Sequence, residues 1–140
     1  MIYLLDTNTC IGYLNRRNPA IYQHFLAISA DEVCICDVVK FELYYGAYKS
    51  SRMAENLKNL NIFFGDLISL PFDGKAAKIC GEIRVTLQAA GTTIGAYDLQ
   101  IGAIALANNL TLVTHNTREF QRIPGLQLED WEDDPTDAYS

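Results

Sequence analysis

Long apolar runs are absent from this 140-residue sequence, although hydrophobic residues make up 49% of it. A membrane-spanning helix needs about 18 or more consecutive apolar residues, and no stretch comes near that length, so we expect no membrane association. The first residues also lack a basic segment followed by a cleavage site, which favours a cytoplasmic location. A chain of this length is expected to form one domain that buries roughly two-thirds of its unfolded surface.

An excess of positive charge is absent too, since the formal net charge is −6. Residues 129–140 hold six acids and no Lys or Arg, so the body before them is neutral. We expect residues 132–140 to be a solvated, frayed acidic tail. The body lacks the basic excess typical of nucleic-acid-binding domains, but a local basic patch on a neutral surface can still bind a phosphate backbone.

Metal-binding cysteine patterns are also missing. Cys34 and Cys36 share one face of a predicted strand, but no second Cys or His pair accompanies them, and Cys10 and Cys80 lie far away in the sequence. We therefore expect four reduced, structural thiols of a cytosolic protein. The two histidines, His24 and His115, stand alone and are expected to be structural or surface residues, with His115 less settled because of its neighbours.

Short apolar runs alternate with segments of helical periodicity along the whole chain. Strands are predicted at residues 2–5, 32–36, 67–70 and 110–114, with a weaker fifth at 126–129. Helices are predicted from residue 9 with a break near Asn18 and Pro19, at 38–49, around 53–64, around 76–87 and at 96–109. This alternation predicts an α/β fold, with a central parallel sheet of four to five strands and helices on both faces.

Acidic and amide side chains stand where the predicted strands end. Asp6 ends the first strand, Glu42 and Asp98 lie in the first turns of helices, and Asn116 and Glu119 follow the fourth strand. In an open parallel sheet, sites lie beyond the carboxyl ends of the strands, so we expect these side chains to converge. Carboxylates brought together need protonation, pairing or a cation, and oxygen ligands of this kind suit Mg²⁺ or Mn²⁺.

Each of these acids also has a structural explanation. Asp6 could cap the helix that follows it, and Asp98 could complement a helix dipole. Glu42 could be an ordinary exposed helix residue. A second feature of that helix is an aromatic stripe of Phe41, Tyr44, Tyr45 and Tyr48. We expect the stripe to be core, with a protein interface as the alternative, because Tyr is enriched at interfaces.

Four segments of the chain resemble the PIN domain, and specifically the VapC-type toxins of bacterial toxin–antitoxin pairs. These segments are "LLDTNTC", "FELYYGA", "GTTIGAYDLQIGAIAL" and "LVTHNTREFQRIPGLQLEDW". The resemblance implies a PIN-like three-layer fold over residues 1–131 and a Mg²⁺- or Mn²⁺-dependent ribonuclease. The family's acidic cluster falls on Asp6, Glu42 and Asp98. Its usual fourth acid falls on Asn116, which brings no charge, so one well-held ion is the expectation rather than two.

The resemblance also suggests roles for these residues. Asp6 and Asp98 would hold the ion, and Glu42 would bind it directly or through water, while Asn116 would position substrate or water. Glu42 or Asp98 would orient the attacking water or accept its proton. The residues expected to fix these ligands by hydrogen bonds are Thr7, Asn8 and Thr114. The candidates for contacts to the RNA backbone are Arg16, Arg17 and Arg118, which could equally be solvated surface charges.

The expected function is therefore that of a toxin of a type II toxin–antitoxin pair, an endoribonuclease acting on a specific RNA such as a tRNA. A VapB-type antitoxin lying in a groove near the acids and a homodimer are the partners implied. The alternatives are a nuclease acting on DNA, a related phosphohydrolase, or a catalytically weak or silent PIN-like domain acting through protein binding. A nucleotide-binding module has no G-x-G-x-x-G or G-x-x-x-x-G-K-[ST] motif to support it.

Overall fold

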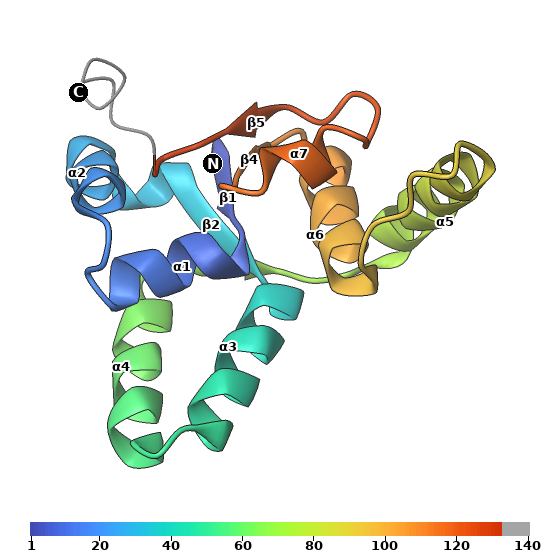
Figure 1. The fold of residues 1–140 in the computed structure, drawn as a ribbon. Coiled ribbons are helices and arrows are strands. Elements are labelled where there is room, and N and C mark those ends of the chain that lie inside the picture. Colours follow the sequence, from blue (N-terminus) through green and yellow to red (C-terminus); the bar gives the residue numbers. More distant parts are fainter. Residues whose placement is uncertain (133–140) are drawn as a thin grey trace.

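A computed structural model describes residues 1–132 of the chain, and its centre is a five-stranded sheet in the order β3-β2-β1-β4-β5 (Figure 1). Every strand pairing is parallel, and Leu4 of the central strand pairs with Cys34 and with Leu112. The strands are β1 (Tyr3–Leu5), β2 (Val33–Cys36), β3 (Ile68–Leu70), β4 (Thr111–Val113) and β5 (Leu128–Glu129). The predicted parallel sheet is confirmed, including its weak last strand.

Helices cover both faces of this sheet. They are α1 (Thr7–Leu14), α2 (Pro19–Ala27), the 3₁₀ turn η1 (Ala30–Glu32), α3 (Asp37–Lys49), α4 (Met53–Gly65), α5 (Gly74–Ala89), α6 (Ala96–Ala107) and α7 (Thr117–Phe120). Figure 1 shows α1, α2 and α4 to one side of the strands and α5, α6 and α7 to the other. Because parallel crossovers are right-handed, the reversal of strand order after β3 moves the later helices to the opposite face. The three-layer prediction is thereby confirmed.

The predicted break between the first two helices has a clear local cause. The side-chain oxygen of Asn18 accepts a hydrogen bond from the backbone N–H of Ala20 at 2.9 Å, and Pro19 occupies the first turn of α2. An Asn cap followed by Pro is a favoured helix start, because Pro lacks the N–H that would otherwise be unsatisfied there. At the far end of α5, Gly91 adopts a φ of 69°, the left-handed conformation in which Gly ends helices easily.

The core lies where β1, β2 and β4 meet the helices. Leu4, Leu5, Ile35 and Leu112 are completely buried, and Trp131 is buried from the other end of the chain. Gly102 of α6 is needed here because an added Cβ would lie 2.6 Å from the side chain of Ile123. The four cysteines, Cys10, Cys34, Cys36 and Cys80, are free thiols, the first three buried and the last half-buried.

The aromatic stripe of α3 contradicts the expectation of core packing. Phe41, Tyr45 and Tyr48 are 50%, 59% and 62% exposed, and only Tyr44 packs inward, against the ring of Phe64. The face of α3 that does enter the core carries shorter aliphatic side chains, Val38, Val39, Leu43 and Ala47. The core prediction is wrong because two overlapping apolar stripes run along this helix and the sheet selects the aliphatic one.

The predicted acidic tail falls almost entirely outside the described residues. Glu132 is the one tail residue that the structure describes, and its backbone carbonyl accepts a hydrogen bond from Asn18 at 3.4 Å. The division into residues 1–131 and a frayed tail therefore stays a prediction. Within residues 1–132, every helix is too short or too polar to cross a lipid bilayer.

Candidate active site

The predicted site residues are carried to one edge of the sheet by four different elements. Asp6 follows β1 and caps α1, Glu42 lies in the second turn of α3, and Asp98 lies in the first turn of α6. Asn116 follows β4 and begins α7. These positions share the carboxyl-terminal edge of β1 and β4, the strands at which the strand order reverses, where parallel sheets place their binding sites.

Asp6 is a buried carboxylate, only 4% exposed. One of its oxygens, Oδ1, accepts a hydrogen bond from the backbone N–H of Thr9 at 2.8 Å, so the capping role considered for this residue is real. Burial raises the pKa of Asp6, and hydrogen bonds from Thr114 and Thr9 offset part of that rise. The backbone N–H of Thr9 and the side chains of Thr9 and Thr114 thus fix the orientation of the Asp6 carboxylate, which the fold holds away from water.

Glu42 is held by Thr7. The Thr7 hydroxyl donates to Oε1 of Glu42 at 2.7 Å, across a sequence separation of 35 residues. This bond connects the first turn of α1 to the second turn of α3, and it leaves the second carboxylate oxygen for another partner. Glu42 also lines the large groove described below, so it stands between the acid edge and that groove.

Asp98 shows most directly that the acids converge. Its pKa is raised to about 6, first by burial and then by the negative charges of Glu42, Asp6 and Glu119, in that order. Every charged neighbour named here opposes ionisation of Asp98. Among the ion pairs within residues 1–132, none includes Asp6, Glu42 or Asp98. An external cation would therefore be attracted to this edge.

Glu119 converges with the other acids, as its position after the fourth predicted strand indicates, and the structure adds a role that the sequence alone did not assign to it. The amide of Asn116 donates from Nδ2 to Oε2 of Glu119 at 3.1 Å, and the backbone N–H of Asn116 donates to the hydroxyl of Thr114 at 3.0 Å. Glu119 thus acts on Asp98 from α7, although Asn116 itself carries no charge. The sequence feature that indicates this role is the position of Glu119 in the first turn of a helix that follows β4.

Asn8 lines a smaller hollow of about 440 Å³, together with Arg17, Asn18 and Asn116. His115 and Glu132 complete this hollow, together with Ile11 and Gly12. Asn116, hydrogen-bonded to Glu119, places the hollow at the rim of the carboxylate cluster. That Asn8 fixes a ligand by a hydrogen bond stays a prediction.

A second carboxylate group lies next to this hollow. Nδ1 of His115 is 2.9 Å from Oδ2 of Asp130 and 2.9 Å from Oε2 of Glu132. Among the described residues, this is the group whose potential ligand atoms all lie within 4.8 Å of one another, so Asp6, Glu42 and Asp98 are more widely spaced. Wider spacing suits Mg²⁺, which keeps several waters and binds directly to only one or two carboxylates.

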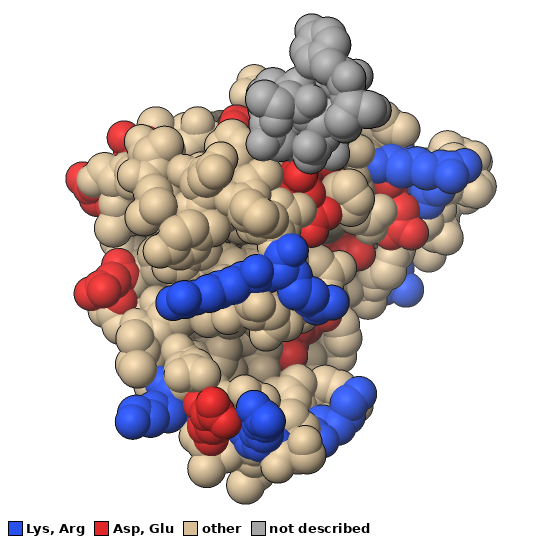
Figure 2. All heavy atoms as spheres, turned by 60° about the vertical axis from the view of Figure 1, so that its left-hand side comes forward, with Lys and Arg blue, Asp and Glu red and all other residues tan. Residues whose placement is uncertain are grey.

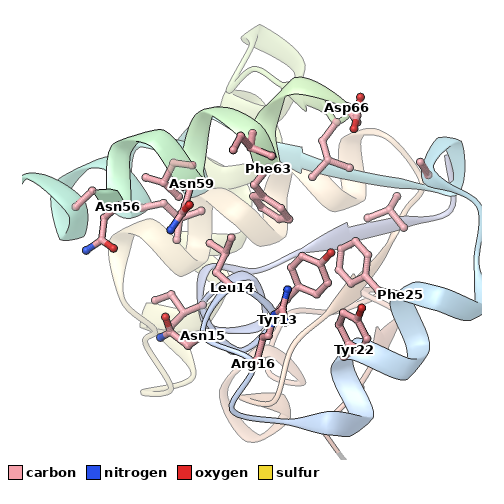
Figure 3. Close-up of a pocket in the computed structure, with 18 of the residues that line it drawn as sticks. Tyr13, Leu14, Asn15, Arg16, Tyr22, Phe25, Asn56, Asn59, Phe63 and Asp66 are labelled. Atoms are coloured by element: carbon pink, nitrogen blue, oxygen red, sulfur yellow. The ribbon is translucent and has the colours of Figure 1, made fainter. Parts of the chain in front are cut away.

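The large groove lies between α1, α2, α3 and α4 and has a volume of about 820 Å³ (Figure 3). Its wall is aromatic: the ring of Tyr13 stacks on Phe25 with 4.2 Å between centroids and meets Phe63 at 5.6 Å. Arg16 and Asp66 also line it, so both charge signs are present. An open groove of this volume, with an aromatic wall and polar side chains beside it, fits a peptide or helix better than a small ligand.

Basic side chains gather on the same side of the molecule. Arg16 and Arg17 form the connection between α1 and α2, and Arg16 adopts a φ of 51°, which is uncommon for a residue with a side chain. Figure 2 shows Lys and Arg side chains crossing the middle of this face, with acidic side chains beside them. Arg17 lines the small hollow and Arg16 the large groove, whereas Arg118 lies on α7.

Comparisons with known proteins agree with this geometry. The PIN domain family profile matches residues 3–126. A protein of Rickettsia felis called Ribonuclease VapC2 is 40% identical over 133 residues, covering 94% of this chain and 99% of that protein. A tRNA(fMet)-specific endonuclease VapC of Salmonella typhimurium is 40% identical over 129 residues, covering 92% of this chain and 97% of its own length.

Several solved structures with the same fold are VapBC complexes. The structure of VapBC2 from Rickettsia felis bound to a DNA fragment from their promoter superimposes with a TM-score of 0.87 and 39% identity, covering 94% of this chain and 99% of the other. The structure of DNA-bound VapBC from Salmonella typhimurium gives a TM-score of 0.88 and 39% identity, covering 94% and 98%. Fold and sequence therefore lead to the same group of proteins.

Proposed function

This chain belongs to the PIN domain family, within the VapC group of toxin ribonucleases of toxin–antitoxin systems, and we propose that Asp6, Glu42 and Asp98 form its catalytic centre. The observation that carries this assignment is the convergence at Asp98: the charges of Glu42, Asp6 and Glu119 all raise its pKa. Four carboxylates brought to one edge, none of them in an ion pair within residues 1–132, are suited to binding an external cation.

PIN nucleases generally need a divalent metal ion, and the donor set here, all oxygen, fits Mg²⁺ or Mn²⁺. When bound, such an ion polarises a phosphate oxygen and lowers the pKa of a coordinated water. Asp6 and Asp98 are the residues that we propose hold it, with Glu42 binding directly or through water. Glu119 supplies the fourth negative charge that Asn116 lacks.

The protein's own groups then perform the remaining tasks. Glu42, fixed through Oε1 by Thr7, has Oε2 available to orient the attacking water and accept its proton. Thr114 and Thr9 keep the carboxylate of Asp6 in place, and Asn116 positions water or substrate from the rim. The outcome is hydrolysis of an RNA phosphodiester bond by in-line attack.

Among the kinds of RNA that a ribonuclease could cleave, we propose a specific tRNA as the substrate. The Salmonella relative is named for tRNA(fMet), and so is a relative from Shigella flexneri that is 37% identical over 129 residues. Arg16, Arg17 and Arg118 are the candidates for phosphate contacts, because Arg16 and Arg17 line the two hollows and Arg118 lies on α7 with Glu119. We propose that cleavage takes place in the cytoplasm, where tRNA is found.

The test is to incubate the purified chain, free of any partner, with total RNA, with and without Mg²⁺ or Mn²⁺. Asp98→Asn is run beside it, with Asp31→Asn as the matched control, since Asp31 is an exposed residue of η1. We expect discrete, metal-dependent cleavage that Asp98→Asn removes and Asp31→Asn keeps. Cleavage that survives both chelation and Asp98→Asn would overturn the assignment, and binding of a partner without cleavage would favour a silent domain.

The VapBC structures support a VapB-type antitoxin as partner, and we propose that it lies in the aromatic groove. Because the groove extends to Glu42, an occupant there would also reach the acid edge. Gly46 lines the groove and has open space where a Cβ would lie, so Gly46→Leu should fill the groove without strain and reduce capture of a co-expressed VapB antitoxin. Gly81→Leu on α5, equally unobstructed, is the control.

We also propose a homodimer. The exposed rings of Tyr45 and Tyr48 on the outer turns of α3 are its candidate contacts, since exposed aromatic side chains favour interfaces. Light scattering of the purified chain, compared with Tyr48→Glu, measures the oligomeric state. A monomeric wild-type protein, alone and in complex with antitoxin, would contradict the homodimer.

A further inference from the structure

Two aromatic residues stand immediately before two of the proposed catalytic acids. Phe41 precedes Glu42 on α3, and Tyr97 precedes Asp98 on α6. Although they lie 56 positions apart in the sequence, their rings meet edge to face, with 5.3 Å between centroids and an interplanar angle of 66°. The two helices therefore bring together a pair of rings as well as a pair of carboxylates.

The two rings are only partly buried by the fold. Phe41 is 50% exposed and Tyr97 is 48% exposed, whereas neighbouring core residues such as Leu43 and Leu99 are 5% exposed. An edge-to-face contact leaves ring faces without an aromatic partner. Two large apolar rings thus remain half in water beside the proposed reaction centre, a position from which a substrate could cover them.

We propose that Phe41 and Tyr97 form a stacking platform for an unpaired nucleobase next to the bond that is cleaved. The inference rests on the proposed function and adds a substrate contact to it. Unpaired bases of RNA are commonly recognised by stacking on aromatic side chains, because every base has a π face. Phe41 and Tyr97 each directly precede a proposed catalytic acid, and Glu42 and Asp98 are close enough for one charge to act on the other, so a base stacked on the ring pair would lie near these carboxylates.

The charge of the molecule supports this assignment. The chain has a net charge of −6, and the acid edge itself repels a phosphate backbone wherever a cation does not neutralise it. Electrostatic attraction of the RNA backbone therefore contributes less to RNA affinity here than in a basic nuclease. Stacking is independent of backbone charge, which makes an aromatic pair at this edge a suitable source of affinity.

A second copy of the chain is the competing occupant, because Tyr45 and Tyr48 continue the exposed stripe of α3. RNA is favoured for the Phe41–Tyr97 pair because Tyr97 belongs to a different helix from that stripe and because both residues directly precede proposed catalytic acids in the sequence. Substitution by leucine distinguishes an RNA base from a second copy of the chain as the occupant. Phe41→Leu and Tyr97→Leu keep apolar contact area, which an apolar protein interface tolerates, but they remove the π face that a base requires.

The experiment measures cleavage of an RNA oligonucleotide spanning the cut bond, first mapped with the wild-type protein. We expect Phe41→Leu and Tyr97→Leu each to raise KM about tenfold with little change in kcat, since stacking on one base contributes of that order. Phe72→Leu, at an aromatic residue that is 38% exposed in the segment between β3 and α5, is the matched control and should behave as wild type. Light scattering and thermal unfolding of each variant report oligomeric state and folding.

A second arm uses substrates in which one base beside the cut bond is replaced by an abasic site. At the stacked position, the wild-type protein should lose about the same tenfold, and the leucine variants should lose nothing more. Three outcomes would each overturn the platform. One is an unchanged KM in the leucine variants, and another is a change of oligomeric state that accounts for the rise in KM. The third is that the leucine substitution and the abasic site weaken cleavage independently, so that their effects multiply. Failure of the wild-type protein to cleave any RNA with Mg²⁺ or Mn²⁺ would instead overturn the proposed function.

Discussion

Two groups of carboxylates lie close together in this molecule, and they differ in what neutralises them. Asp130 and Glu132 each lie 2.9 Å from Nδ1 of His115, on a partly exposed surface. Asp6 and Asp98 are less exposed to solvent than that histidine, and burial raises the pKa of both. The charge of Asp130 adds to the rise at Asp6, so the two groups are neighbours, and the charges of Glu42, Asp6 and Glu119 add to the rise at Asp98. One group contains its own potential cation, and the other does not.

The difference shows why carboxylates alone do not identify a functional site. Asp130 and Glu132 satisfy a simple distance criterion for metal binding better than the inner acids do. Yet a carboxylate already hydrogen-bonded to an imidazole has less need of a metal, whereas Asp98 gains from any cation that approaches. The raised pKa of Asp98, rather than the closeness of ligand atoms, points to the inner group as the functional one.

The largest effect that would test this contrast is on catalysis. Asp98→Asn should lower kcat/KM for RNA by about a thousandfold, because it removes a proposed metal ligand, whereas Asp130→Asn should change it less than about threefold. Both variants replace one carboxylate by an amide of the same shape. Steady-state cleavage of the same RNA by each protein measures the ratio, and equal losses in the two variants would remove the distinction between the groups.

Metal binding gives the next largest effect and has a readout that is independent of activity. A ligand present at about a hundredfold over its Kd stabilises a folded protein by about 2.7 kcal/mol. Mn²⁺ or Mg²⁺ should therefore raise the melting temperature of the wild-type protein by several degrees, and Asp98→Asn should abolish most of that rise. A rise that persists in Asp98→Asn but disappears in Asp130→Asn would place the metal at the histidine group instead.

The pH dependence of stability is a smaller effect with a defined sign. The pKa of Asp98 is raised to about 6 from an ordinary 3.8, so between these values the folded chain holds a proton that the unfolded chain has released. In metal-free buffer, the free energy of unfolding should therefore fall by about 2 kcal/mol from pH 4 to pH 7 because of this group. Urea unfolding of the wild-type protein and of Asp98→Asn at both pH values isolates the contribution of Asp98. If the free energy of unfolding changes equally with pH in the two proteins, the raised pKa of Asp98 is contradicted.

Much of this contrast could be read from the sequence. Asp6, Glu42 and Asp98 stand at predicted strand ends or helix starts, and the rule for parallel sheets brings such positions together. The sheet itself followed from apolar runs of four or five residues between helical segments. These features are local or follow from one topological rule, so a single sequence is enough to predict them.

The parts that could not be predicted depend on side-chain geometry between distant elements. The roles of Glu119 and of the α3 stripe are two such cases. The short helix α7 brings the charge of Glu119 close enough to act on Asp98, and the sheet selects Leu43 over Phe41 for burial. The contact of His115 with Asp130 is a third, since it forms only when the segment after β5 returns to the end of β4. Periodicity identifies candidate faces, but packing decides which face is buried.

His115 provides the smallest and last test of the contrast. Its side chain is 59% exposed, and exposed ion pairs contribute less than about 1 kcal/mol, because water already solvates the separated charges well. His115→Gln should therefore lower the free energy of unfolding by less than about 1 kcal/mol and leave RNA cleavage within about threefold of wild type. Urea unfolding and the cleavage assay measure both quantities. A tenfold loss of cleavage with unchanged stability would show that the outer group takes part in the reaction, and the separation of the two carboxylate groups would then no longer hold.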